Sequence, residues 1–186
     1  LRKRLVDLRL QQFGAQLDDE RARELDAAFA RTFSEYGVDL DGDDLVPALN
    51  RIRERRIGED VALALDDWGR VRRRVHGAKS EKAENLLYLA MDLDPDAGRL
   101  RLRQAIFDND SSALLELAAP ENLPKLGPGS IWILGMTLFE RFPARRPDVL
   151  AMFDQALDLY PSDFLLLAIG GGIHSEAGNH QAALTC

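Results

Sequence analysis

Apolar residues recur at the spacing of an α-helix along nearly the whole chain. Between about Asp18 and Tyr36 they return every three or four positions, as on one face of a helix. The members of that face are Ala22, Leu25, Phe29, Phe33 and Tyr36. Asp18 or Asp19 can cap the start of such a helix, and Gly37 suits the left-handed residue after its end. The pattern therefore predicts a helix over 18–36.

The same spacing predicts more helices on both sides of an acidic turn at 39–44. An earlier helix would place Leu1, Leu5, Leu8 and Phe13 on one face. After the turn we expect a short helix over about 45–55 and a longer one beginning near Glu59. The apolar side of the longer helix would consist of Val61, Leu65, Trp68, Val71 and Val75.

Two later segments share one sequence pattern. Each has a small or apolar residue, a large one four positions later, Ala three after that, and Pro five further on. The segments begin at Ala83 and Val149, and their prolines, Pro95 and Pro161, are 66 positions apart. That distance is close to twice a period of about 34 residues, which is typical of stacked helical hairpins.

Other segments supply the partner helices of these hairpins. Residues 131–138 place Gly135 after Leu134, where two helices can approach closely. A third unit follows Pro161, with a turn at Gly178 before its second helix.

The unit over 96–127 is degenerate. Its first helix would hold Leu100, Leu102, Ala105 and Ile106. Asp110 can cap a short second helix, which Pro120 ends early. The loop over 121–129 holds two prolines and two glycines, so we expect a flexible seam there.

Residues 60–186 resemble tetratricopeptide repeats, most closely over 128–161. The sequence differs from the family's pattern at two positions: Ile131 stands where a large aromatic residue is expected, and Leu138 stands where a Tyr is expected. The resemblance implies an all-α fold: a right-handed superhelix of antiparallel helical hairpins after an N-terminal helical segment. We therefore expect two domains, an N-terminal helical segment over 1–57 and tetratricopeptide-like repeats over 58–186, truncated at the C-terminus.

Two N-terminal segments, 29–39 and 62–74, are similar to recurring segments of large bacterial serine/threonine protein kinases. In those proteins the segments follow the kinase domain and precede tetratricopeptide-like repeats, and the order here is the same. The resemblance implies the non-catalytic, cytoplasmic part of a kinase-related protein. No His-Arg-Asp, no Asp-Phe-Gly and no glycine-rich phosphate loop is found, so we expect no enzyme activity in this chain. Because the chain begins at Leu1, we expect it to be part of a longer protein.

In such repeat arrays the first helix of each hairpin lines a concave groove. By the repeat register, seven residues would point into it: Leu102, Ile106, Trp132, Met136, Phe139, Leu165 and Ala168. An apolar groove with a Trp suits a helical or extended peptide of a protein partner. The alternative is that these side chains pack against neighbouring helices and leave no open groove.

Composition narrows the choice of fold and partner. Leu and Ala provide 54 residues, whereas Val, Ile and Thr provide only 17, which favours helices over a large sheet. The net charge is −7, with zero net charge over 1–80 and all of the excess over 81–186, which argues against nucleic-acid binding. The longest uncharged stretch has 14 residues, too few to span a membrane. The single cysteine, Cys186, excludes an internal disulfide and a zinc site made of thiolates.

Other candidate sites have simpler interpretations. Residues 39–44 carry acidic residues in an alternating pattern, as a calcium-binding loop does, but their glycine is two positions away from where such a loop has it. We interpret these residues as a solvated turn, with adventitious cation binding as the alternative. The three histidines lack metal-site spacing, and the glycine run over 170–172 lies inside a helix. The arginine runs at 51–56 and 70–74 predict solvated helix faces, with docking to an acidic partner as the alternative.

We therefore expect a non-catalytic interaction or scaffold region that binds a peptide or protein partner and needs no cofactor or metal. The alternative is a structural spacer or a homodimerisation element formed by the helices at 1–36.

Overall fold

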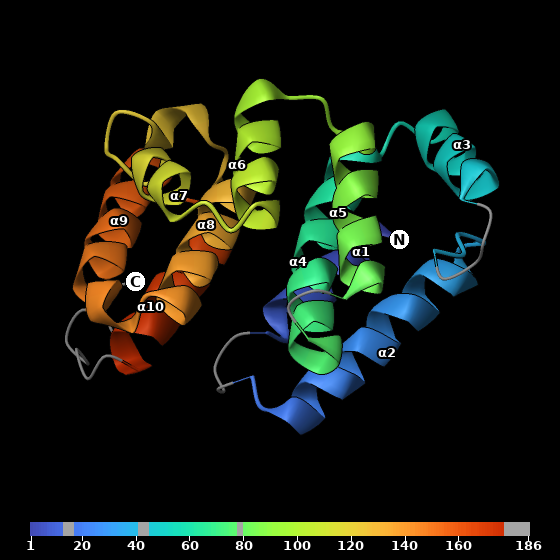
Figure 1. Ribbon diagram of the computed structural model, residues 1–186, viewed down its shortest axis with the longest axis horizontal. Helices are drawn as coiled ribbons and strands as arrows, with labels where there is room; N and C mark the ends of the chain where they lie inside the picture. The colour runs from blue at the N-terminus through green and yellow to red at the C-terminus, as the bar shows by residue number, and fades with distance from the viewer. Residues whose placement is uncertain (13–16, 41–44, 78–79, 177–186) are drawn as a thin grey trace. The chain divides into compact units, whose positions relative to one another are not determined.

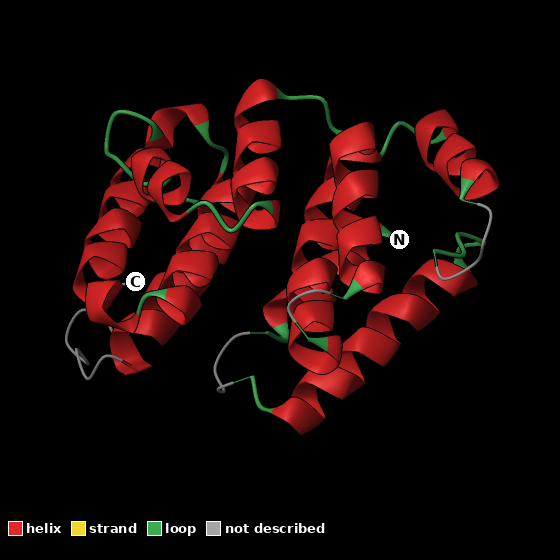
Figure 2. Cartoon of the chain, viewed as in Figure 1, coloured by secondary structure: helices red, strands yellow, loops and turns green. Residues whose placement is uncertain are grey.

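The computed structural model describes residues 1–12, 17–40, 45–77 and 80–176. Within these ranges the chain forms ten α-helices and two short 3₁₀ helices, and no strand (Figure 2). The prediction of an all-α fold is confirmed.

The helices group into two compact units, one ending at Asp96 and the other beginning at Ala97 (Figure 1). The first unit holds α1 (Arg2–Leu10), α2 (Asp19–Glu35), α3 (Val46–Glu54), α4 (Gly58–His76) and α5 (Glu81–Leu93). The second holds α6 (Ala97–Phe107), α7 (Ser111–Leu117), α8 (Pro128–Arg141), α9 (Arg146–Leu159) and α10 (Phe164–Glu176). The sequence-based division at 57/58 follows motifs, whereas the contacts place α4 and α5 with the N-terminal helices.

The expected helix over 18–36 is present as α2, with the expected ends. The Asp18 carboxylate accepts a hydrogen bond from the Arg21 backbone N–H at 2.8 Å, which caps the helix. Gly37 has a φ of +71°, the left-handed conformation that a glycine adopts without strain. The apolar stripe of α2, with Leu25, Phe29 and Phe33, is buried.

Helix α4 lies at the centre of the first unit and is buried on nearly all sides. It packs against α1, α2, α3 and α5. The Trp68 ring stacks with Phe29 and Phe33 of α2, at centroid distances of 5.9 and 5.4 Å. The Arg72 guanidinium lies 4.0 Å from the centroid of the same ring. The predicted apolar side of this helix is therefore part of the core of the unit, and four of its polar residues, Asp66, Asp67, Arg70 and Arg72, are buried as well.

The prediction of a solvated face for the arginine run over 70–74 is wrong for Arg70 and Arg72, which are buried. The reason is that α2 and the residues around α1 supply partners for these charges. Arg70 donates to Gln12, and Arg72 donates to Asp26 at 3.0 Å. On the same helix, the buried Asp67 pairs with Arg9 of α1. Arg51, Arg53, Arg55 and Arg56, by contrast, are exposed as expected.

In the second unit α8 and α9 form an antiparallel hairpin joined by a short turn, and α10 packs on both. The predicted close approach at Gly135 is confirmed. A Cβ atom built on Gly135 would lie 2.6 Å from Phe153 Cε2 and 2.9 Å from Met152 Cε, so α9 packs directly on the backbone of α8. Only glycine fits at this position without moving a buried ring.

The degenerate unit is also present, as α6 and the short α7. The Asp110 carboxylate caps α7 by accepting from the backbone N–H groups of Ser112 and Ala113, both at 3.0 Å. The following loop over 121–129, where a flexible seam is expected, packs on the helices. Leu123 and Leu126 are fully buried, and the Tyr160 hydroxyl donates to the Leu126 carbonyl at 2.9 Å. Apolar side chains within this proline-rich loop hold it on the helices.

Candidate interaction site

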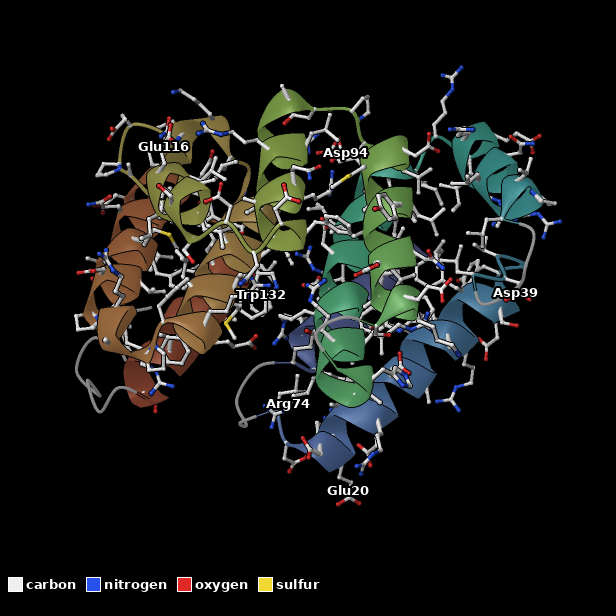
Figure 3. The ribbon with its side chains drawn as sticks, viewed as in Figure 1. Glu20, Asp39, Arg74, Asp94, Glu116 and Trp132 are labelled. Atoms are coloured by element: carbon white, nitrogen blue, oxygen red, sulfur yellow. The ribbon has the colours of Figure 1, made fainter. Side chains whose placement is uncertain are left out.

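The seven residues predicted to line a groove lie on α6, α8 and α10. Four of them are buried: Leu102, Ile106, Trp132 and Phe139. The other three are half-buried: Met136, Leu165 and Ala168. Figure 3 labels Trp132 on α8, where only 1% of the residue is exposed. Such burial is what the alternative interpretation expects, in which these side chains pack within the chain.

The end of α8 is fixed to α6 through Arg141. Its guanidinium donates to the Asn109 side-chain carbonyl at 2.8 Å and to the Ile106 carbonyl at 3.4 Å. Burial of the Arg141 side chain lowers its pKa, although an arginine remains charged at neutral pH. Asn109 holds a φ of +56°, which turns the chain between α6 and α7. The unit therefore holds α6, α7 and α8 in a fixed arrangement.

A hollow of about 190 Å³ lies beside these helices, between α7, α8 and α9. Its floor is apolar, with Leu138 of α8 and Val149 and Met152 of α9, all buried. Leu115, Ala118 and Ala119 close the side formed by α7 and the residues after it. Exposed Arg145 and Asp148 form a polar rim. We call this the α7–α9 hollow.

The hollow exists because α7 is short. Helix α7 has 7 residues and α9 has 14, so α7 is shorter than α9 by roughly 10 Å at 1.5 Å per residue. Pro120 follows α7 and cannot continue it, so the chain turns away and leaves the hollow beside α9, where Val149 and Met152 are only 2% and 4% exposed. The early stop at Pro120 is the sequence signal for this site, whereas the repeat register indicates the first helices of the hairpins.

The rim of the hollow is polar, and its side chains are held only by a weak ion pair. Arg145 and Asp148 form an ion pair at 3.6 Å, with 54% and 70% of their side chains exposed. An exposed pair of this kind contributes less than about 1 kcal/mol, so either side chain can turn toward a ligand at little cost. The neighbouring Arg146 already lies over the Phe139 ring, 4.4 Å from its centroid. The rim can thus offer a cation and a carboxylate above an apolar floor.

Polar clusters elsewhere in the described residues join helices. In the first unit the Asp26 carboxylate accepts from Trp68 Nε1 at 2.6 Å and from Arg72 Nε at 3.0 Å, and His76 Nε2 lies 3.3 Å away. Burial raises the pKa of Asp26, but these hydrogen bonds more than offset it, so the pKa lies below the ordinary value. In the second unit His174 contacts Asp154 at 2.9 Å.

Several sequence candidates lie partly or wholly outside the described residues. These are the acidic turn, of which 41–44 are not described, and Gly178 and His180. Over the ranges that the structure describes, no group of three or more His, Cys, Asp or Glu residues is placed to hold a metal ion. Among the described helices none combines the length and the apolar character needed to cross a membrane.

Comparisons with protein-family models, with curated proteins and with solved structures gave no match. The function of the chain is therefore inferred from its sequence segments, from the packing of its helices and from the α7–α9 hollow.

Proposed function

We propose that this chain is a non-catalytic protein-interaction region of a serine/threonine-kinase-related protein, built from tetratricopeptide-like hairpins, that binds a protein or peptide partner. The observation that carries the proposal is the α7–α9 hollow, an apolar recess between three helices. Burying apolar surface stabilises a complex by about 25 cal/mol per Å² before the entropy of association is subtracted. A recess of this kind concentrates that gain on one inserted side chain.

The packing of consecutive helices supports the tetratricopeptide-like part of the proposal. Helices α4 and α5, α8 and α9, and α9 and α10 pack as neighbours in sequence and in space. The contact of Gly135 with Phe153 occupies the position where the repeat pattern requires a small residue. Helices α6 and α7 correspond to the degenerate unit, and the second helix predicted for the last hairpin would lie outside the described residues.

The order of the segments supports the parentage. Residues 29–39 and 62–74 resemble kinase-associated segments, and they precede the repeats as they do in that family. In this chain the two segments pack together, because α2 and α4 contact each other through Phe29, Phe33 and Trp68. The resemblance thus falls on residues that form one core.

The second candidate function, a spacer or a homodimer through the helices at 1–36, is less well supported. A dimer of this kind needs an apolar face on α1 or α2 that the chain itself leaves open. Leu5 and Leu8 of α1 are buried within the chain, as are Phe29 and Phe33 of α2. The same α4 helix contacts both α1 and α2, so their main apolar faces are already covered.

The test has two steps, capture and reconstitution. The chain, immobilised at its N-terminus, is used to capture proteins from cells that express it, and each candidate is then purified and titrated against the chain by calorimetry. We expect one purified protein to bind a monomeric chain, with monomer mass fixed by light scattering. If no purified candidate binds, or if the chain is a dimer that binds nothing further, the proposal is wrong.

A further inference from the structure

We propose that the α7–α9 hollow binds an apolar side chain that the partner protein presents from an acidic segment. The inference rests on the proposed function, because it assumes a partner protein, and it specifies the chemistry of the residues that anchor that partner. Three properties of the site support it: the size and lining of the hollow, the charges at its rim, and the position of the rim at the start of α9.

The hollow is suited to one apolar side chain. Its volume is about 190 Å³. An engineered apolar cavity of about 150 Å³ in another protein is large enough to bind benzene, so this hollow can accept a side chain of the size of leucine or phenylalanine. The floor consists of Leu138, Val149 and Met152, which are buried and carry no charge. The inserted group must be apolar, because a charged group would lose its hydration there without gaining a partner.

The charges at the rim favour carboxylates beside that side chain. Arg145 and Asp148 line the hollow and form an ion pair at 3.6 Å, so their charges offset each other. Arg146 follows directly, is exposed, and contacts the Phe139 ring through its guanidinium. The start of α9 therefore holds two guanidinium groups against one carboxylate, and a carboxylate of the partner would be attracted to it.

The turn between α8 and α9 is the basic part of an acidic unit. Residues 140–148 hold three arginines and two acidic residues. The remaining residues of 97–176 hold four basic and eight acidic residues. Most of the second unit therefore repels an acidic segment, whereas the turn attracts it, and this difference directs such a segment to the hollow.

Helix α9 begins at the same rim. Arg145 is its N-cap residue, and among the described residues no side chain caps the first turn. The start of a helix carries a partial positive charge, which attracts anions. Asp148 lies in this first turn and uses part of that attraction, but its pair with Arg145 is exposed and weak. A carboxylate of the partner would therefore compete with Asp148 for Arg145.

The first experiment uses three short capped peptides as probes: Ala-Glu-Leu-Glu-Ala, the same peptide with Lys in place of both Glu, and the same with Ala in place of Leu. Binding to the intact chain is followed by the methyl NMR signals of Leu115, Leu138, Val149 and Met152, which line the hollow. We expect the Glu-Leu-Glu peptide to shift these signals and to bind about tenfold more tightly than either of the others. Equal or tighter binding of the Lys or Ala peptide would overturn the proposal, as would shifts located elsewhere.

The second experiment changes the rim charges, with opposite expected results. Asp148→Asn removes the competing carboxylate and should tighten the Glu-Leu-Glu peptide about two- to fivefold, whereas Arg145→Gln should weaken it by about the same factor. Both side chains are exposed, so the thermal midpoint should change by less than about 4 °C.

The matched control is Asp158→Asn, which makes the same change on an exposed residue of α9. It lies roughly 15 Å farther along the helix at 1.5 Å per residue, beyond the Debye length of about 10 Å in 0.1 M salt, and should leave the affinity unchanged. If Asp148→Asn fails to tighten the peptide, or Arg145→Gln fails to weaken it, the proposal is wrong.

The third experiment blocks the hollow. Ala118→Leu adds bulk to its wall, and Ala151→Leu makes the same change at an exposed position of α9 that does not line it. We expect Ala118→Leu to weaken the Glu-Leu-Glu peptide about tenfold or more and Ala151→Leu to leave its affinity unchanged. If Ala118→Leu binds the peptide as wild type does, the hollow is not the site.

The two proposals can fail separately. If a purified partner binds the wild-type chain and the Ala118→Leu chain equally well, a partner exists but the hollow does not anchor it. If the Glu-Leu-Glu peptide binds the hollow but no protein partner is found, the chemistry assigned to the hollow stands and the proposed function fails.

Discussion

The contact between α8 and α9 at Gly135 offers the sharpest test of the hairpin packing. We consider Gly135→Ala, which adds one methyl group to the face of α8 that meets α9. The added Cβ would lie 2.6 Å from Phe153 Cε2 and 2.9 Å from Met152 Cε. Ordinary carbon–carbon contacts begin near 3.5 Å, so the Phe153 ring must move. That ring is fully buried and has little room to move.

The expected effect is the difference between two opposing contributions. Alanine is a better helix former than glycine by about 1 kcal/mol, which stabilises the variant. Overpacking a well-filled core costs about 1–3 kcal/mol, which destabilises it. The helix-propensity gain can be measured separately in Gly172→Ala, because no described atom lies within 4 Å of a Cβ built on Gly172. We therefore expect the free energy of unfolding of Gly135→Ala to be lower than that of Gly172→Ala by about 1–3 kcal/mol.

The assay is urea unfolding followed by circular dichroism, with the slope m compared across variants to confirm the same transition. A double-mutant cycle adds Phe153→Leu to Gly135→Ala. Because Phe153 is the group that must move, the two changes should show a coupling energy of about 1 kcal/mol or more. If Gly135→Ala is as stable as Gly172→Ala, α8 and α9 do not meet at this glycine, and the hairpin packing described here is wrong.

Three further predictions concern polar groups that join or cap helices. The pKa of Asp26 is lowered in the folded chain, so the carboxylate stabilises the fold fully above a pH of about 4, and this stabilisation is lost as the pH falls through the pKa of the folded state. Asp26→Ala should therefore lower the free energy of unfolding by about 1–3 kcal/mol at pH 7. In urea unfolding, the difference between Asp26→Ala and wild type should become smaller in acid. Asp110→Ala removes the cap of α7 and should lower the free energy of unfolding by about 1 kcal/mol, whereas a change below about 0.3 kcal/mol would contradict the capping geometry. Arg141→Met removes the hydrogen bonds to Asn109 and Ile106 and should lower the thermal midpoint of unfolding, by about 2–4 °C for each kcal/mol of unfolding free energy lost. An unchanged midpoint would contradict this prediction.

The helices could be predicted from the sequence because their apolar residues repeat with the helical period. Asp18 and Gly37 mark the ends of α2 by local chemistry that needs no knowledge of the rest of the chain. The close approach of two helices at Gly135 could be predicted, because the repeat pattern also gives the position of the partner helix. Each of these inferences depends on neighbours in sequence or on a periodic spacing.

Features that depend on which helix covers which could not be predicted in this way. The period of α4 identifies its apolar stripe, but it does not reveal that Gln12 and Asp26 come from neighbouring segments to pair with Arg70 and Arg72, which are buried. The α7–α9 hollow likewise arises from the lateral placement of a short helix beside a long one. Pro120 indicates in the sequence where α7 ends. The space beside α9 could not be predicted from it, because that space depends on how the two helices lie next to each other.

The most direct test of the central claim is photo-crosslinking at the hollow inside cells. A benzophenone amino acid is placed at Asp148, on the rim, and in a second strain at Ala151, on the outer face of the same helix. The chain is then isolated after irradiation, and its crosslinked products are identified by mass spectrometry. We predict one partner protein crosslinked from position 148 and none from position 151. No crosslink from position 148, or the same products from both positions, would contradict the claim that this hollow holds a partner.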